Sequence, residues 1–141
     1  ELIAAARRVS RETPGPSFNR ITHLADALLP PRLGGEPHLG QLRFQLLTSI
    51  AGTVAYATER AVKRAVLVIH EFRTHVTNDA FLSDNHRDLE RTIERLTNGD
   101  TRSVAMNQLV GPLRFPGNQY ISRDVELFIG KVRRELLAME F

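Results

Sequence analysis

The chain has 141 residues and a formal net charge of +3, with 42% hydrophobic and 25% charged residues. These values suit one globular domain and exclude a disordered, collagenous or low-complexity chain, and no segment holds the roughly 20 apolar residues of a membrane helix. The absence of cysteine excludes disulfides, thiolate nucleophiles and cysteine zinc sites, so we expect a cytoplasmic location.

The first third of the chain predicts two helices. In the first, over residues 1–11, arginines occupy the faces opposite an apolar stripe. Residues 13–16 (Thr-Pro-Gly-Pro) end it, and Ser17 is placed to cap a second helix that runs to Pro30. The two apolar stripes are Leu2, Ile3, Ala6 and Val9, and then Ile21, Leu24, Ala25 and Leu28. Residues 32–40 predict a loop.

The central segment predicts a helix over residues 42–61, followed by a strand. One helix side is apolar, and the other carries a stripe of small or polar residues: Gln45, Ser49, Gly52 and Tyr56. Close packing of another helix against this stripe is the alternative to a functional surface. The apolar run 65–69 predicts a strand buried on both faces of a sheet, with His70 and Glu71 at its carboxyl end, where ligands collect in open α/β sheets.

The last part of the chain predicts one helix and two further strands. A polar loop covers residues 73–82, Ser83 or Asp84 begins the helix, and residues 98–99 (Asn-Gly) end it. Pro112 restricts the segment 109–115 to an edge strand or a bulge. Residues 125–132 fit either a helix or a strand, and we favour a strand.

Few residues form a motif that carries chemistry. The histidines lack metal-ligand spacing, and a histidine at a strand end, such as His70, is more often a hydrogen-bonded structural imidazole than a base. Asp124 and Glu126 could hold a magnesium ion or form a solvated edge. No acidic residue is followed two positions later by lysine, and no nucleophile elbow or phosphate-binding loop is present. We therefore assign no catalytic residue and no metal ligand within the chain.

Three segments together carry a family resemblance. The strings Leu-Arg-Phe-Gln-Leu-Leu (42–47), Val-Ile-His-Glu-Phe (68–72) and Val-Gly-Pro-Leu-Arg-Phe-Pro-Gly (110–117) resemble a bacterial family of unknown function with the PD-(D/E)XK, or restriction-endonuclease-like, fold. Such folds hold Mg²⁺ on an Asp strand and a Glu-x-Lys strand and hydrolyse phosphodiester bonds. The resemblance implies that these acidic strands lie outside this chain.

The resemblance also implies roles for residues that are present. Gln45 and His70 become supporting candidates near the scissile phosphate. Four arginines become candidates for binding DNA: Arg7, Arg8, Arg11 and Arg43. From the pattern alone, Arg43 could instead be half-buried against a carboxylate.

We therefore expect an α/β (α+β) fold, restriction-endonuclease-like, with a small mixed sheet, helices on both faces and no N-terminal strands. Residues 1–141 would be one domain, the C-terminal portion of a larger nuclease-like domain. An N-terminal segment or a homo-oligomer would complete the sheet. The expected function is Mg²⁺-dependent hydrolysis of DNA, and the alternative is a non-catalytic interaction or assembly module. Whether the chain is an enzyme stays open, because its sequence contains no catalytic motif.

Overall fold

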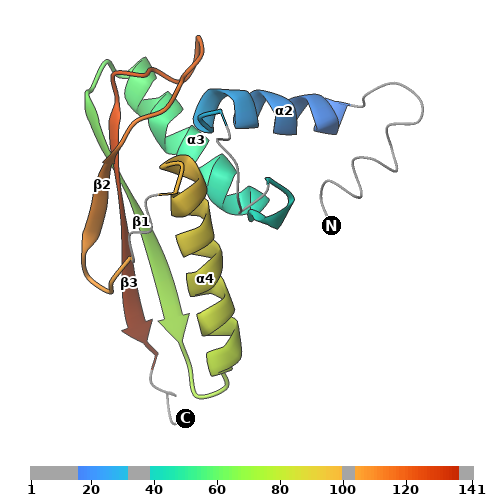
Figure 1. Ribbon diagram of the computed structural model, residues 1–141. Helices are drawn as coiled ribbons and strands as arrows, with labels where there is room; N and C mark the ends of the chain where they lie inside the picture. Colours follow the sequence, from blue (N-terminus) through green and yellow to red (C-terminus); the bar gives the residue numbers. More distant parts are fainter. Residues whose placement is uncertain (1–15, 32–38, 100–103, 137–141) are drawn as a thin grey trace.

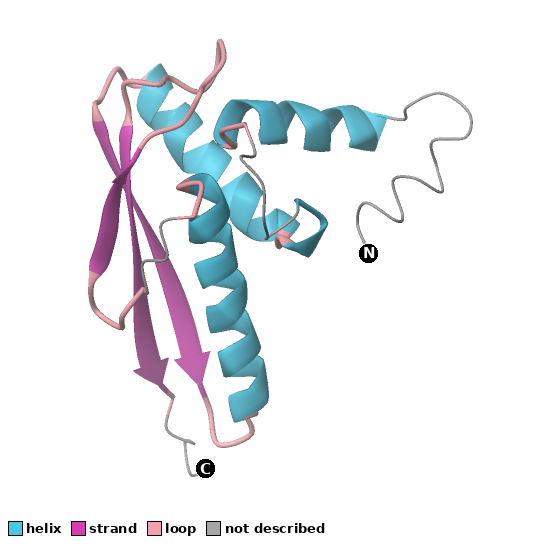
Figure 2. Ribbon diagram, viewed as in Figure 1, coloured by secondary structure: helices cyan, strands magenta, loops and turns pink. Residues whose placement is uncertain are grey.

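The protein is described by a computed structural model that covers residues 16–31, 39–99 and 104–136. Its elements follow the order α2 (Pro16–Leu28), a short 3₁₀ turn (Leu39–Gln41), α3 (Phe44–Glu59), β1 (Arg64–Arg73), α4 (Asp79–Leu96), β2 (Leu109–Leu113) and β3 (Glu126–Glu135) (Figures 1 and 2). The predicted helix over 1–11 and the loop at 32–38 lie outside the described residues. The mixed α+β class and the small mixed sheet are confirmed.

The sheet has the strand order β1-β3-β2. β1 and β3 run parallel, and their register continues unbroken from the pair Arg64–Glu126 to the pair Arg73–Glu135. β2 is antiparallel to β3, and its register shifts between Val110 and Leu113, on either side of Pro112. The prediction of an edge strand or bulge at this proline is confirmed, because proline lacks the N–H that a regular ladder requires. Residues 126–135 form the strand that we favoured.

The hydrophobic core lies between one face of the sheet and the helices. α3 and α4 lie on the same side of the sheet, and α2 packs across α3 (Figure 1). The fully buried side chains come from all these layers: Leu28, Ile50, Val54, Ile93, Leu127 and Ile129. The inner face of the sheet is therefore the face that α3 and α4 cover.

The prediction that strand 65–69 is buried on both faces is wrong. Burial alternates along β1: Ala65, Leu67 and Ile69 pack against the core. Val66, Val68 and Phe72 are 51%, 45% and 52% exposed on the other face. Among the described elements, no helix covers this outer face, so the expected second helical layer is not seen there. Apolar residues at successive positions of a strand do not by themselves show that another layer of the protein packs on each face.

Two helix boundaries also differ from expectation. α4 begins at Asp79, earlier than Ser83, because the Asn78 side chain caps it and accepts a hydrogen bond from the N–H of Ala80 at 2.8 Å. α3 ends at Glu59, and Ala61 has a positive φ of 53° just beyond it. Asn98 and Gly99 have the positive φ values expected at the end of a helix, so the predicted stop of α4 is confirmed.

Candidate functional site

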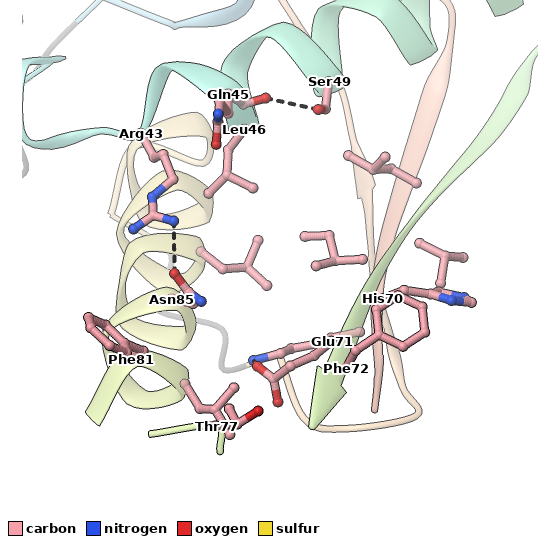
Figure 3. Close-up of a pocket in the computed structure, with 16 residues that line it drawn as sticks. Arg43, Gln45, Leu46, Ser49, His70, Glu71, Phe72, Thr77, Phe81 and Asn85 are labelled. Atoms are coloured by element: carbon pink, nitrogen blue, oxygen red, sulfur yellow. Dashed lines mark hydrogen bonds and ion pairs between the residues drawn. The ribbon is translucent and has the colours of Figure 1, made fainter. Parts of the chain in front are cut away.

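A cavity of about 550 Å³ lies between the start of α3, the middle of α4 and β1. We call it the edge pocket, because it opens along the edge of β1 that does not pair with β3. Figure 3 shows Gln45 and Arg43 on one side of it, Asn85 on α4, and Glu71 pointing in from β1. The polar residues that line the edge pocket are Arg43, Gln45, Ser49, His70, Glu71, Thr77, Asn85 and Lys131.

A buried group of charges forms the floor of this pocket. The Nζ atom of Lys131 lies 2.7 Å from Oε2 of Glu71, and these side chains are only 3% and 7% exposed. Arg133 donates a hydrogen bond from Nε to the other carboxylate oxygen of Glu71. Glu71 on β1 is the register partner of Arg133 on β3, so their side chains lie on the same face of the sheet. Lys131 is two residues before Arg133, and side chains two residues apart on a strand share a face. All three side chains therefore lie on the inner face. We call this group the charge cluster.

The charge cluster controls the ionisation of its carboxylate. Burial alone would raise the pKa of Glu71, but the hydrogen bonds and positive charges of Lys131 and Arg133 outweigh burial. The pKa of Glu71 is therefore held below its usual value, and the carboxylate is charged at neutral pH. Its two cations leave the cluster with one excess positive charge. This arrangement favours an anion in the pocket over a metal cation.

Arg43 occupies the position that caps α3, but its guanidinium binds α4 instead. It donates to Oδ1 of Asn85 at 2.8 Å, and its other terminal nitrogen lies 2.7 Å from Oδ2 of Asp88. The structure thus shows the alternative in which this arginine is held against a carboxylate. Its side chain is still 44% exposed at the rim of the edge pocket, so part of the guanidinium faces solvent.

The structure brings some of the candidate residues together and separates others. Gln45 lies at the edge pocket, and its backbone carbonyl accepts a hydrogen bond from Ser49 Oγ at 2.8 Å. The imidazole of His70 lies on the outer face of β1 beside the ring of Phe72, with ring centroids 6.0 Å apart (Figure 3). It therefore points away from the charge cluster. Arg7, Arg8 and Arg11 lie outside the described residues.

The carboxylates give no metal site in the described part of the chain. No cluster of three or more histidine, aspartate or glutamate side chains is found among residues 16–31, 39–99 and 104–136. Glu126, one of the two carboxylates considered for magnesium, instead binds Arg114 at 2.7 Å and Arg64 at 3.4 Å. The hydrogen bond from Arg114 is the main cause of its lowered pKa. The described residues therefore do not fit Mg²⁺.

Lys131 and Arg133 belong to the candidate site but were not predicted from the sequence. The Glu-x-Lys pattern places an acid and a lysine on one strand. Here Glu71 and Lys131 belong to two parallel strands and meet across them. One signal was present in the sequence: Lys131 interrupts the apolar run of β3, and a lysine inside a buried strand requires a partner.

Comparison with known proteins places the chain in a family. The model of a domain of unknown function, DUF6946, matches residues 7–136. The chain belongs to this family. No curated protein and no solved structure matches it. In the described part of the chain, no helix is both long enough and apolar enough to span a membrane.

Proposed function

We propose that this DUF6946 domain binds DNA as the C-terminal portion of a restriction-endonuclease-like, Mg²⁺-dependent phosphodiester hydrolase. One observation supports the proposal above all: Gln45 and the contacting pair Glu71–Lys131 line the same pocket. The excess positive charge of the charge cluster suits a phosphate oxygen. Because the described residues do not fit Mg²⁺, the acidic ligands of the metal would come from elsewhere, and we assign no metal-dependent step to this chain.

DNA binding is tested with a fluorescent duplex titrated at several salt concentrations. Affinity should fall as salt rises, because each phosphate contact releases counterions. Replacement of Arg43 by glutamine should weaken binding. It should also make the slope of log affinity against log salt concentration shallower, by the amount of about one phosphate contact. Arg87→Gln is the matched control, since Arg87 is an exposed arginine on α4 whose contact is Asp84. Affinity that does not depend on salt would contradict the proposal.

Hydrolysis is tested with plasmid DNA, the full-length protein and Mg²⁺ or Mn²⁺. We expect Gln45→Ala to slow cleavage about 10-fold or more while the melting temperature stays nearly unchanged, because this exposed side chain lies at the pocket and not in the core. A large fall in the melting temperature would instead identify Gln45 as structural. Absence of cleavage by the unaltered protein would overturn the hydrolase proposal.

A non-catalytic interaction module is the second candidate function. The specific observation in its favour is the unpaired edge of β1, which among the described strands pairs with β3 alone. An exposed strand edge is a ready site for adding a strand from another polypeptide.

A further inference from the structure

The unpaired edge of β1 presents a regular row of backbone hydrogen-bonding groups. The carbonyls of Lys63 and Arg73 accept hydrogen bonds from the N–H groups of Glu126 and Leu136, so odd-numbered residues direct their backbone groups toward β3. Because these directions alternate along a strand, even-numbered residues direct theirs away from β3. Within the described part of the chain, no strand pairs with the N–H and C=O groups of Arg64, Val66, Val68, His70 and Phe72.

β1 lacks two of the features that protect strand edges. It contains no proline, and its register with β3 has no bulge over all 10 residues. Its outer face carries the half-exposed Val66, Val68 and Phe72, and the register places Phe128 and Val132 beside them on β3. A strand that is apolar on both faces is typical of the interior of a sheet. β1 is therefore built like a strand with a neighbour on each edge.

Space for an added strand lies alongside this edge. The edge pocket covers one end of it, and a second groove of about 630 Å³ continues past Ser49, Gly52 and Tyr56 on α3. A Cβ built on Gly52 would meet no atom within 4 Å. The stripe of small and polar residues on α3 thus leaves room for the side chains of another strand on the inner side of β1.

The charges along this edge indicate the chemistry of the partner. Among the described residues, the cations that line the edge pocket and the groove are Arg43, Arg64 and Lys131, and Glu71 is the acidic residue that lines them. Each cation already contacts a carboxylate, Asp88, Glu126 and Glu71 in turn. Glu126 and Glu71 are each shared with a second arginine, Arg114 and Arg133, so positive charge remains in excess along this edge. A second copy of β1 fits poorly. An antiparallel pair centred on Val68 would use every open group, but it would set Lys63 opposite Arg73 of the second copy, and like charges in that position are destabilising.

We propose that the open edge of β1 binds an extended acidic segment of a partner polypeptide as an added β-strand. Its acidic side chains lie on the inner side, toward Arg43 and the polar stripe of α3. Its apolar side chains lie on the outer face beside Val66, Val68 and Phe72. The inference rests on the second candidate function and does not require DNA or metal.

The test uses a synthetic peptide as long as β1, which has 10 residues, with glutamate alternating with valine. Binding is measured by fluorescence anisotropy without DNA or divalent metal. We expect saturable binding that weakens with added salt. A peptide with lysine in place of glutamate, and one with N-methyl groups on alternate backbone amides, should each bind at least about 10-fold more weakly. Arg43→Gln should weaken binding, whereas Arg87→Gln should not.

Amide hydrogen exchange locates the peptide. In the free chain, the N–H groups of Val66, Val68 and His70 should exchange faster than those of Leu67 and Ile69, and the peptide should slow exchange at the even-numbered positions by about 10-fold or more. Protection that appears without peptide and grows with protein concentration would identify a second copy as the occupant and overturn the proposal. Equal binding of the N-methylated peptide, or no saturable binding at millimolar concentration, would also overturn it. None of these results bears on DNA cleavage.

Discussion

Glu71 is the residue on which most of the site depends. Its carboxylate joins β1 to β3 through the buried Lys131 and the partly exposed Arg133. A buried carboxylate and a buried ammonium each lose hydration, so neither is stable there without the other. The charge cluster therefore has a structural role whichever ligand the edge pocket binds.

The first prediction concerns Glu71→Gln. This change leaves Lys131 buried without its counter-charge and should lower the free energy of unfolding by about 3 kcal/mol at neutral pH. Because the folded-state pKa of Glu71 lies below its ordinary value of 4.5, the stabilisation by its carboxylate is complete above that pH. It is lost as pH falls through the folded-state pKa.

Urea denaturation between pH 7 and pH 3 measures this effect. The difference in stability between the unaltered protein and the Glu71→Gln variant should be constant down to about pH 5 and should shrink below it. Glu59→Gln, at the exposed end of α3, serves as the control and should change stability little. A difference between the unaltered protein and Glu71→Gln that grows toward acid pH would contradict the lowered folded-state pKa of Glu71.

At the scale of the element, β1 shows how one strand combines two environments. Its odd-numbered residues pack against the core, and its even-numbered residues face outward. If both faces of the run 65–69 were buried, a charge at any of its positions would unfold the domain. The alternation in the structure instead predicts that the effect depends on which face receives the charge.

The second prediction therefore compares two neighbours. Val68→Asp, on the outer face, should lower the free energy of unfolding by about 1 kcal/mol, mostly through a reduced preference for the strand conformation. Leu67→Asp, on the inner face against the core, should cost several kcal/mol, about 3 or more, or prevent folding. Thermal and urea denaturation of the two variants provide the comparison. Equal losses would mean that both faces of β1 are covered in solution.

For the whole molecule, the main feature is a sheet with one described face open. Val66, Val68, Phe72 and Leu109 are each about half exposed, and β1, β3 and β2 bring them to the same side. A contiguous apolar surface of this kind marks an interaction site or promotes association of the isolated protein.

The third prediction tests this surface through solubility. The double variant Val68→Thr with Phe72→Lys should remain folded, reach a higher soluble concentration and bind less of a hydrophobic dye than the unaltered protein. Tyr120→Lys removes a more exposed aromatic residue from a loop and should still change these measurements much less. Equal gains from both variants would show that the sheet face has no special tendency to associate.

Most of the fold could be predicted from local signals in the sequence. Apolar periodicity located α2, α3 and α4, the run at 65–72 located β1, and Pro112 marked the irregular edge strand. The start of α4 was missed because Asn78 caps the helix five residues before Ser83, the earlier of the two predicted starts. These are contacts between residues close in sequence, so a pattern can reveal them.

The candidate site depended on contacts that no local pattern contains. The position of Gln45 on the polar side of its helix was visible in the sequence. That it lines the same pocket as Glu71 and Lys131 follows only from the packing of α3 on the sheet. His70 follows Ile69 by one residue, and strand alternation places its ring on the opposite face. His70 still lines the edge pocket, but sequence spacing alone gave no means of telling that its ring lies on the opposite face of β1 from Glu71.

The sequence by itself determined which segments form helices and strands, that one helix face is small and polar, and that β1 is apolar on both sides. Only the tertiary structure decided that β1 lies at an edge of the described sheet, that Glu71 meets Lys131 and Arg133 across two strands, and that no described helix covers one sheet face. The physical reason is that periodicity records which side chains avoid water, whereas strand order and register decide which of them meet.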